Sequence, residues 1–127
     1  MSRNGRTATA TMTDTEKESR VKKELHHLEE IFRDVDDKKR DFVQRQIEQL
    51  AWFNVSIVDL QERVDQFGTL VTYDNGGGQN GVRTNPDVKT LLDYQKACST
   101  IVRTLLSIVP EGKITKKRDL DQFRLHA

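Results

Sequence analysis

A glycine-rich stretch of this 127-residue chain has the spacing of a phosphate-binding loop. In YDNGGGQNGVRTNP (residues 73–86), Gly76 and Gly81 are placed like the two glycines of such a loop, whose backbone amides surround phosphates. That loop also needs Lys and then Ser or Thr after the second glycine, where this chain has Val82 and Arg83. It should also follow a buried strand, whereas the pattern before residue 68 predicts a helix. The stretch therefore does not predict a nucleotide site.

A second group of residues has metal-binding side chains. His26, His27, Glu29 and Glu30 follow one another closely on a predicted helix, at the spacing found in carboxylate-bridged di-iron bundles. Such a site needs a second copy of the motif with inward-facing acids, and none is recognised elsewhere in the chain. Zinc is not favoured either, because the chain has one Cys and three His. A solvated helix face is the better interpretation.

The single cysteine, Cys98, is a possible nucleophile. It lies in an apolar stripe between Leu91 and Leu105, where burial disfavours the thiolate, so the sequence predicts core packing. Ser, Asp and His residues fall in no hydrolase motif, and His126 is close to the end of the sequence. We therefore expect a non-enzymatic protein without a cofactor, a metal or a small-molecule substrate.

Composition and charge indicate a helical protein that completes its core with copies of itself. Hydrophobic residues make up 35% and charged residues 32% of the chain, with a net charge of +1. The mean hydropathy of −0.72 is low for a self-sufficient core. One cysteine excludes an intrachain disulfide, and no apolar run approaches the roughly 20 residues that span a bilayer. The N-terminus lacks the apolar stretch of a signal peptide. These features predict a soluble, intracellular protein without a membrane partner.

Two long amphipathic helices dominate the expected all-α fold. The first spans about residues 38–67, carries a heptad seam of apolar residues and ends at Gly68, a residue type favoured after helix C-termini. The second begins after Asn85, a preferred N-cap followed by Pro86, and ends at Pro110. Both apolar arcs are wider than one neighbour covers. We therefore expect an antiparallel helical hairpin that packs against other subunits in a ring-like homo-oligomer.

Shorter elements flank this hairpin. An N-terminal helix is expected to begin near Thr13, which forms a capping-box pattern with Glu16. Between the long helices, residues 68–84 contain β-branched residues and Asn-Gly pairs, which predict a small β-hairpin or an ordered loop. The expected parts are a disordered arm (1–12), a helical oligomerisation domain (13–110) and a basic tail (111–127) that holds a loosely attached short helix.

Several residues of the first long helix are candidates for a subunit interface. Trp52 and Val55 project from the main apolar arc, so they either form an interface or pack under the N-terminal helix. Asn54 and Gln61 fall inside the arc, where a buried amide can fix the helix register or the oligomeric state. The expected interface residues are Trp52, Val55, Ile57, Val58 and Leu105.

The basic tripeptide KKR occurs at residues 38–40 and again at 116–118. A basic cluster at the start of a helix opposes the helix dipole, so the first copy needs a reason. Contact with phosphate is one reason, and neutralisation of Asp36, Asp37 and Asp41 is another. Basic ends also occur as plain solvated tails, and this alternative stays open.

The order of these elements resembles the terminase small subunits of tailed double-stranded DNA phages and prophages. In roughly residues 38–112, a long helix ends in GTLV, an NG-containing segment follows, and a helix opened by NP closes at VPEGK. The residues that carry the likeness are Gly68, Gly81, Asn85 and Pro86. In that family this region helps to build the oligomeric helical core, and the glycine-rich segment is the connector between helices.

The resemblance implies a DNA-packaging protein of the host cytoplasm that forms a ring-like homo-oligomer. Such a protein binds viral double-stranded DNA, and it recruits and regulates the large terminase subunit, which holds the ATPase and nuclease. Many members have an N-terminal helix-turn-helix domain, whereas here one helix and an arm precede residue 38. No DNA-contacting residue is therefore transferred by motif.

The distribution of charge and apolar residues suggests how the two ends of the chain divide these roles. The tail is expected to dock on the large subunit through the apolar side formed by Leu120, Phe123 and Leu125. Two other classes of function stay open: a helical scaffold or connector without DNA contact, and a small DNA-binding regulator. The residues expected to contact DNA are Arg3, Arg6, Arg20, Lys22, Lys23, Lys38, Lys39 and Arg40.

Overall fold

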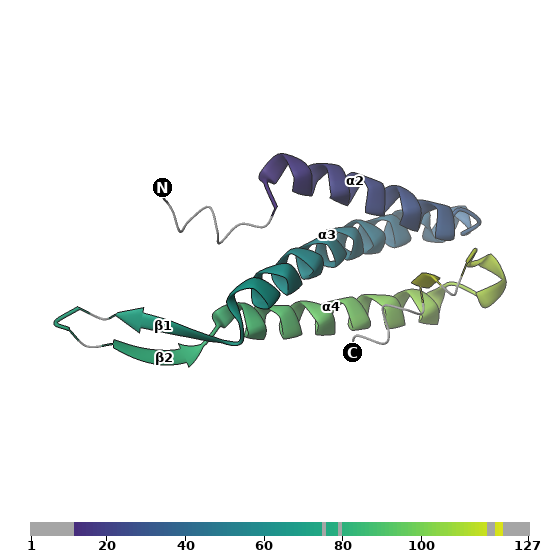
Figure 1. Cartoon of the computed structure of the whole chain (residues 1–127). Coiled ribbons are helices and arrows are strands. Elements are labelled where there is room, and N and C mark those ends of the chain that lie inside the picture. The colour runs from purple at the N-terminus through teal and green to yellow at the C-terminus, as the bar shows by residue number, and fades with distance from the viewer. Residues whose placement is uncertain (1–11, 75, 79, 117–118, 121–127) are drawn as a thin grey trace.

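The structure is a computed structural model, and it describes residues 12–74, 76–78, 80–116 and 119–120. Helices α2 and α4 each pack along α3, and a two-stranded antiparallel sheet joins α3 to α4 and projects beyond the helices (Figure 1). The expectation of a mainly helical chain with a small β-hairpin is thus confirmed. The elements are α2 (Asp14–Ile31), α3 (Asp37–Phe67), β1 (Leu70–Asp74), β2 (Asn80–Thr84), α4 (Pro86–Ile108) and the 3-10 helix η1 (Glu111–Lys113).

The starts of α2 and α4 are fixed by their caps. The hydroxyl oxygen of Thr13 accepts a bond from the backbone amide of Glu16 (3.1 Å), and the same hydroxyl donates to the Glu16 carboxylate (3.1 Å). At α4, the side-chain oxygen of Asn85 accepts from the backbone amide of Asp87 (2.9 Å), and Pro86 is the first helical residue. Both predicted N-caps are confirmed, since each satisfies an amide that the first turn leaves unpaired.

The two ends of helix α3 are capped differently. Asp36 occupies its N-cap position, but its side chain makes no capping bond. At the other end Gly68 adopts a φ of 82° and its amide donates to the carbonyl of Val64 (2.7 Å). A positive φ is strained for residues with a Cβ, so the predicted role of Gly68 as the residue that ends the helix is confirmed.

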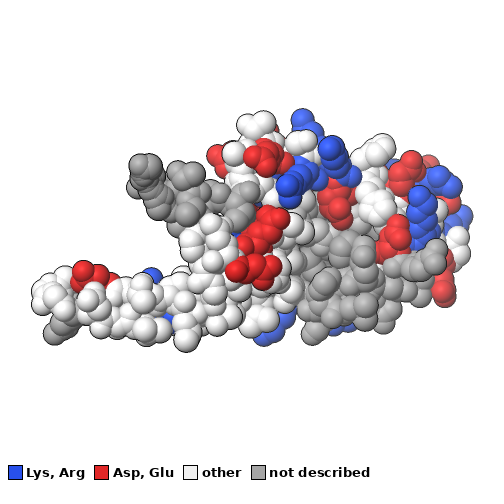
Figure 2. All heavy atoms as spheres, viewed as in Figure 1, with Lys and Arg blue, Asp and Glu red and all other residues white. Residues whose placement is uncertain are grey.

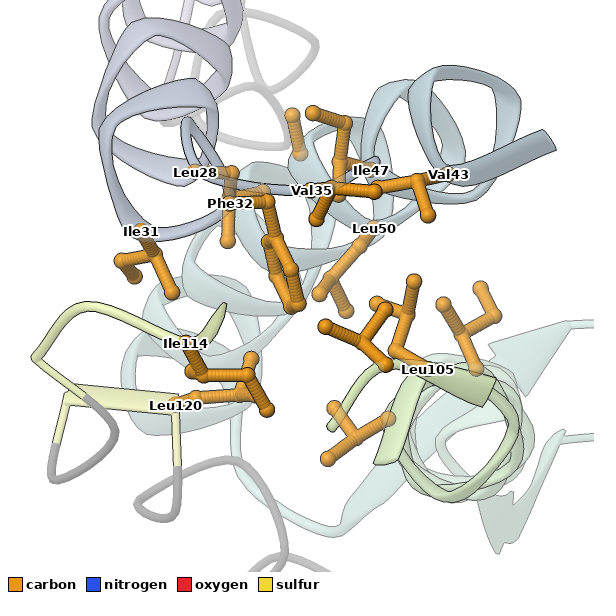
Figure 3. Packing of buried hydrophobic residues seen from close by; sticks show 14 of the residues in the cluster. Leu28, Ile31, Phe32, Val35, Val43, Ile47, Leu50, Leu105, Ile114 and Leu120 are labelled. Atoms are coloured by element: carbon orange, nitrogen blue, oxygen red, sulfur yellow. The ribbon is translucent and has the colours of Figure 1, made fainter. Parts of the chain in front are cut away.

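The hydrophobic core lies at the end of the bundle away from the β-hairpin, where α2, α3, the end of α4 and the following residues meet (Figure 3). The chain after α4 turns back there, and the amide of Thr115 donates to the carbonyl of Ile31 (2.7 Å). Ile114 and Leu120 are buried in this cluster. The prediction of a loosely attached tail is therefore wrong at Ile114 and Leu120, which pack in the core.

The glycine-rich stretch forms the tip and part of the second strand of the hairpin. Gly76, Gly77 and Gly78 have φ values of 83°, 62° and 80°, which suit glycine in a tight turn. Gly81 pairs with Tyr73 across the strands, and a Cβ on Gly81 would lie 2.5 Å from the Tyr73 hydroxyl oxygen. The glycines thus have structural reasons that do not involve a ligand.

Candidate functional site

A groove runs along α3 between the middle of α2 and the middle of α4. It has a volume of about 660 Å³. It forms because α2 and α3 pack closely at the core end and diverge toward the hairpin end (Figure 1). The floor is aliphatic, and the charged side chains that line the groove are of both signs. Val55, Ile57 and Val58 line the floor, and Arg20, Lys23, Glu24 and His27 line the wall.

A row of polar side chains at the groove connects the three helices. The amide of Asn54 donates to the Glu24 carboxylate (2.9 Å), and the thiol of Cys98 donates to the Asn54 side-chain oxygen (3.4 Å). Burial raises the pKa of Cys98 to about 12, and the nearby charge of Glu24 acts in the same direction. The prediction that Cys98 is a core residue with a disfavoured thiolate is confirmed. Asn54 thus aligns α2, α3 and α4 within one chain.

Trp52 of α3 lies outside the groove. Its indole contacts the rings of Phe53 and Tyr94, with centroids 5.4 and 5.6 Å away, and the Lys17 ammonium lies 4.2 Å from the indole centroid. Lys17 belongs to α2, so the indole does pack beside the N-terminal helix. Because 41% of Trp52 stays exposed, it also offers surface to another molecule.

The residues expected at a subunit interface therefore occupy different environments. Leu105 is fully buried in the core and Val55 is 6% exposed, so the chain itself covers both of them. Ile57 is half-buried in the groove floor, and Val58 is 46% exposed. The wide apolar arc of α3 is thus largely explained by α2 and α4. Of the residues expected at the interface, Trp52, Ile57 and Val58 are left for another molecule.

The basic residues of α2 are exposed and surround the groove wall. Arg20 and Lys23 line the groove, whereas Lys22 lines a shallower depression beside Trp52. Figure 2 shows Lys and Arg side chains over α2 with acidic side chains among them. Arg3 and Arg6, which the sequence also assigned to DNA contact, lie outside the described residues.

The basic cluster at the start of α3 has partners within the fold. The Lys39 ammonium donates to the carbonyl of Ile108 (2.7 Å), and the Arg40 guanidinium donates to the carbonyl of Val35 (2.7 Å). A cation at the C-terminal end of α4 is favourable for the helix dipole, which gives Lys39 a structural reason. Lys38 is exposed, and within the described part of the chain it forms no such bond to a backbone carbonyl. Of this cluster, Lys38 is therefore best placed for contact with phosphate.

Two contacts near the hairpin base were not foreseen from the sequence. Arg63 of α3 forms an ion pair with Asp87 in the first turn of α4 (3.1 Å). The side-chain amide of Asn85 also donates to the carbonyl of Gly68 (2.8 Å). The capping pattern indicated Asn85 and Asp87, but a helix start gives no sign of its partner on the preceding helix. Together these contacts hold the ends of α3 and α4 and set the direction in which the hairpin leaves.

Comparison of the chain with family models, with curated proteins and with solved structures gives no match. Over the described residues, no group of three or more His, Cys, Asp or Glu side chains is arranged to hold a metal ion. His27 instead pairs with Asp119 (3.5 Å), and Glu29 accepts a bond from Gln44 (2.9 Å). In that same part of the chain, no helix has the length and apolar character needed to cross a membrane.

Proposed function

We propose that this chain is a non-enzymatic DNA-packaging protein of the terminase small subunit type. In this proposal it assembles as a homo-oligomer, binds viral double-stranded DNA and recruits the large terminase subunit. The observation that carries the proposal is the pairing of two exposed surfaces. The basic residues Arg20, Lys22 and Lys23 of α2 stand beside a groove whose aliphatic floor includes Val58, 46% exposed.

The DNA-binding part of the proposal rests on exposed positive charge repeated by assembly. A few cations per chain give weak affinity, but a homo-oligomer repeats them around the same DNA molecule, and linked contacts reinforce one another. Arg20, Lys22, Lys23 and Lys38 are the described residues that fit this role. Lys39 and Arg40 are less suited to it, because binding phosphate would compete with their bonds to backbone carbonyls.

The assembly part rests on apolar side chains that the chain leaves exposed at the hairpin end. Leu92 of α4 is 53% exposed, and Val58 has a similar exposure. An exposed apolar patch with a polar rim is typical of a protein interface. Contact with the large subunit is assigned to Phe123 and Leu125, which lie outside the described residues. Leu120 is not assigned to this contact, because it is buried in the chain's own core.

A helical scaffold without DNA contact is the second candidate. This candidate is favoured because Lys39 and Arg40, two of the residues expected to bind DNA, instead donate hydrogen bonds to backbone carbonyls of the fold. Acidic residues such as Glu24 also lie among the cations of α2 and weaken the positive electrostatic potential of this helix. The scaffold keeps the exposed apolar patch but predicts no affinity for phosphate.

A titration of labelled duplex DNA followed by fluorescence anisotropy separates the two candidates. The test variant changes Arg20, Lys22 and Lys23 to Gln. A matched control changes Lys89, Lys96 and Arg103 of α4 to Gln, which removes the same charge from another exposed face. We expect the test variant to bind at least about tenfold more weakly and with a shallower salt dependence, since each lost phosphate contact lowers the slope by about 0.9.

The control variant should stay within about threefold of the wild type if α2 forms the DNA surface, since remote surface charges act weakly through salt. Equal losses in the two variants would mean that only overall charge matters, which would contradict the assignment to α2. Absence of binding by the wild-type protein at low salt would favour the scaffold.

A further inference from the structure

The β-hairpin is an arm with one uncovered apolar face. It projects beyond the helices (Figure 1), and its main packing is between its own two strands. The pairing of Thr72 with Val82 and of Leu70 with Thr84 places these four side chains on one face, because alternate residues of a strand point the same way. Leu70 and Val82 are each 62% exposed. An isolated two-stranded hairpin is marginally stable in water, so this arm needs another surface.

The opposite face of the arm is partly covered by its own side chains, and Tyr73 on it is 41% exposed. The Tyr73 ring lies across Gly81, and the Arg83 guanidinium is 5.9 Å from the ring centroid. Val71 on this face is half-buried. Docking is therefore assigned to the face that carries Leu70 and Val82.

The groove on α3 has an apolar floor that fits this face. Ile57 and Val58 of the floor are partly exposed, and the groove is also lined by two cations, Arg20 and Lys23, and two acids, Glu24 and Glu62. The docking face of the arm has the carboxylate of Asp74 and no Lys or Arg among its described residues. The arm of the same chain leaves from the end of α3 and points away from the bundle (Figure 1), so it does not turn back into this groove.

The dimensions of the two surfaces also agree. From Leu70 to Asp74 the strand covers about 13 Å, at roughly 3.3 Å per residue. The groove floor from Asn54 to Gln61 covers about 10 Å of α3, at about 1.5 Å per residue. The volume of about 660 Å³ is sufficient for several side chains of the arm.

We propose that the arm of one chain seats in the groove of a second copy of the same chain. Leu70 and Val82 then cover Ile57 and Val58, and Asp74 approaches Arg20 or Lys23. This inference rests on the homo-oligomer of the proposed function and identifies the two surfaces that build it.

The geometry of this contact has a consequence for the size of the assembly. Arm and groove are different surfaces, so each chain can offer them to two different neighbours, and such a contact closes into a ring or extends into a filament. Two chains that exchange arms reciprocally would instead close into a two-fold dimer.

Cross-linking between two variants that each gain one exposed cysteine tests the arrangement. One variant is Val82→Cys on the arm and the other is Val58→Cys in the groove, and each retains the buried Cys98. We expect a short bismaleimide to produce a covalent dimer when the two variants are mixed, and none when either is treated alone. A chain that carries both substitutions should produce a ladder longer than a dimer, and a product that stops at a dimer would show reciprocal exchange of arms and contradict a ring. Arg45→Cys, an exposed position at the core end of α3, replaces Val58→Cys in a control mixture that should give no covalent dimer.

The other outcomes would overturn the inference in distinct ways. Dimers from Val82→Cys alone would show that arms pair with arms, and dimers from Val58→Cys alone would show that grooves face each other. A mixture without cross-links would exclude the contact. If light scattering still shows an oligomer and DNA binding persists in that case, the arm-in-groove contact fails while the proposed function stands.

Discussion

Replacement of Asn85 by Ala should destabilise the junction between the arm and the two long helices. Asn85 is 4% exposed and caps α4 through its bond from the amide of Asp87 (2.9 Å). Its side-chain amide donates to the carbonyl of Gly68 (2.8 Å), and its backbone amide donates to the carbonyl of Thr69 (2.8 Å). Alanine removes the two side-chain bonds and leaves the backbone bond, so the substitution isolates the contribution of the side chain.

The expected loss follows from these two bonds. Removal of an N-cap costs about 1 kcal/mol. Loss of the second bond costs about 1 kcal/mol more, at the low end of the range because Gly68 is exposed and water can replace the donor. The sum of about 2 kcal/mol is a substantial fraction of the roughly 5–15 kcal/mol that stabilises a typical domain.

Urea unfolding followed by circular dichroism measures this loss. All variants are compared at one protein concentration, because assembly would shift the apparent stability by mass action. Asn85→Ser is the matched control: its hydroxyl can still cap α4 but does not reproduce the bond to Gly68, so it should lose about half as much. With an m-value of about 2 kcal/mol/M, the midpoint of the Ala variant should fall by about 1 M. A loss below about 0.5 kcal/mol for Asn85→Ala would refute the role of this side chain as a clamp.

Three further predictions concern the core, the thiol and the cation at the end of α4. Leu105→Asp should abolish the helical circular dichroism signal, because an unpaired buried charge costs several kcal/mol. Val58→Asp should keep that signal but reduce the mass measured by light scattering. The same outcome for both variants would contradict the different burial of the two residues. Cys98 in the native protein should react with a thiol reagent at pH 8 about a thousandfold more slowly than in urea, because its raised pKa of about 12 leaves little thiolate. The same shift should make the fold lose stability as the pH rises above about 9, where the unfolded thiol ionises and the folded one does not; rapid labelling of the native protein would contradict both expectations. Lys39→Met should lower the free energy of unfolding by about 1 kcal/mol through loss of its bond to Ile108, while Lys38→Met should have little effect; equal effects would contradict the structural role of Lys39.

The features predicted correctly from the sequence depend on chemistry between near neighbours in the chain. The cap at Asn85, the helix end at Gly68 and the turn glycines all act through backbone groups within a few residues. Each of these residue types has a strong conformational preference of its own, so a local pattern is enough to locate it. The paired residues Tyr73 and Gly81 are only slightly farther apart in the chain, because the two strands are joined by a short turn.

The features that the sequence did not provide depend on contacts between distant residues. The partner of Lys39 is 69 positions away, so its cluster looked like a free basic patch. Periodicity marked Val58 and Leu105 alike as apolar, but only the packing of α2 and α4 decides which of them stays exposed. Leu120 contributes to an apolar side of the C-terminal segment. The sequence pattern does not show whether that side packs on the chain's own core or on a partner. The groove could not be predicted either, because it results from the divergence of α2 and α3.

A native mass measurement of the wild-type protein, with and without a short duplex DNA, tests the central claim most directly. It counts the chains in the assembly and the DNA molecules bound to it in a single experiment. The proposed function predicts an assembly of more than two chains that binds duplex DNA as an intact unit at low salt and releases it as the salt concentration rises. A monomer or dimer that gains no DNA mass at low salt would contradict the account.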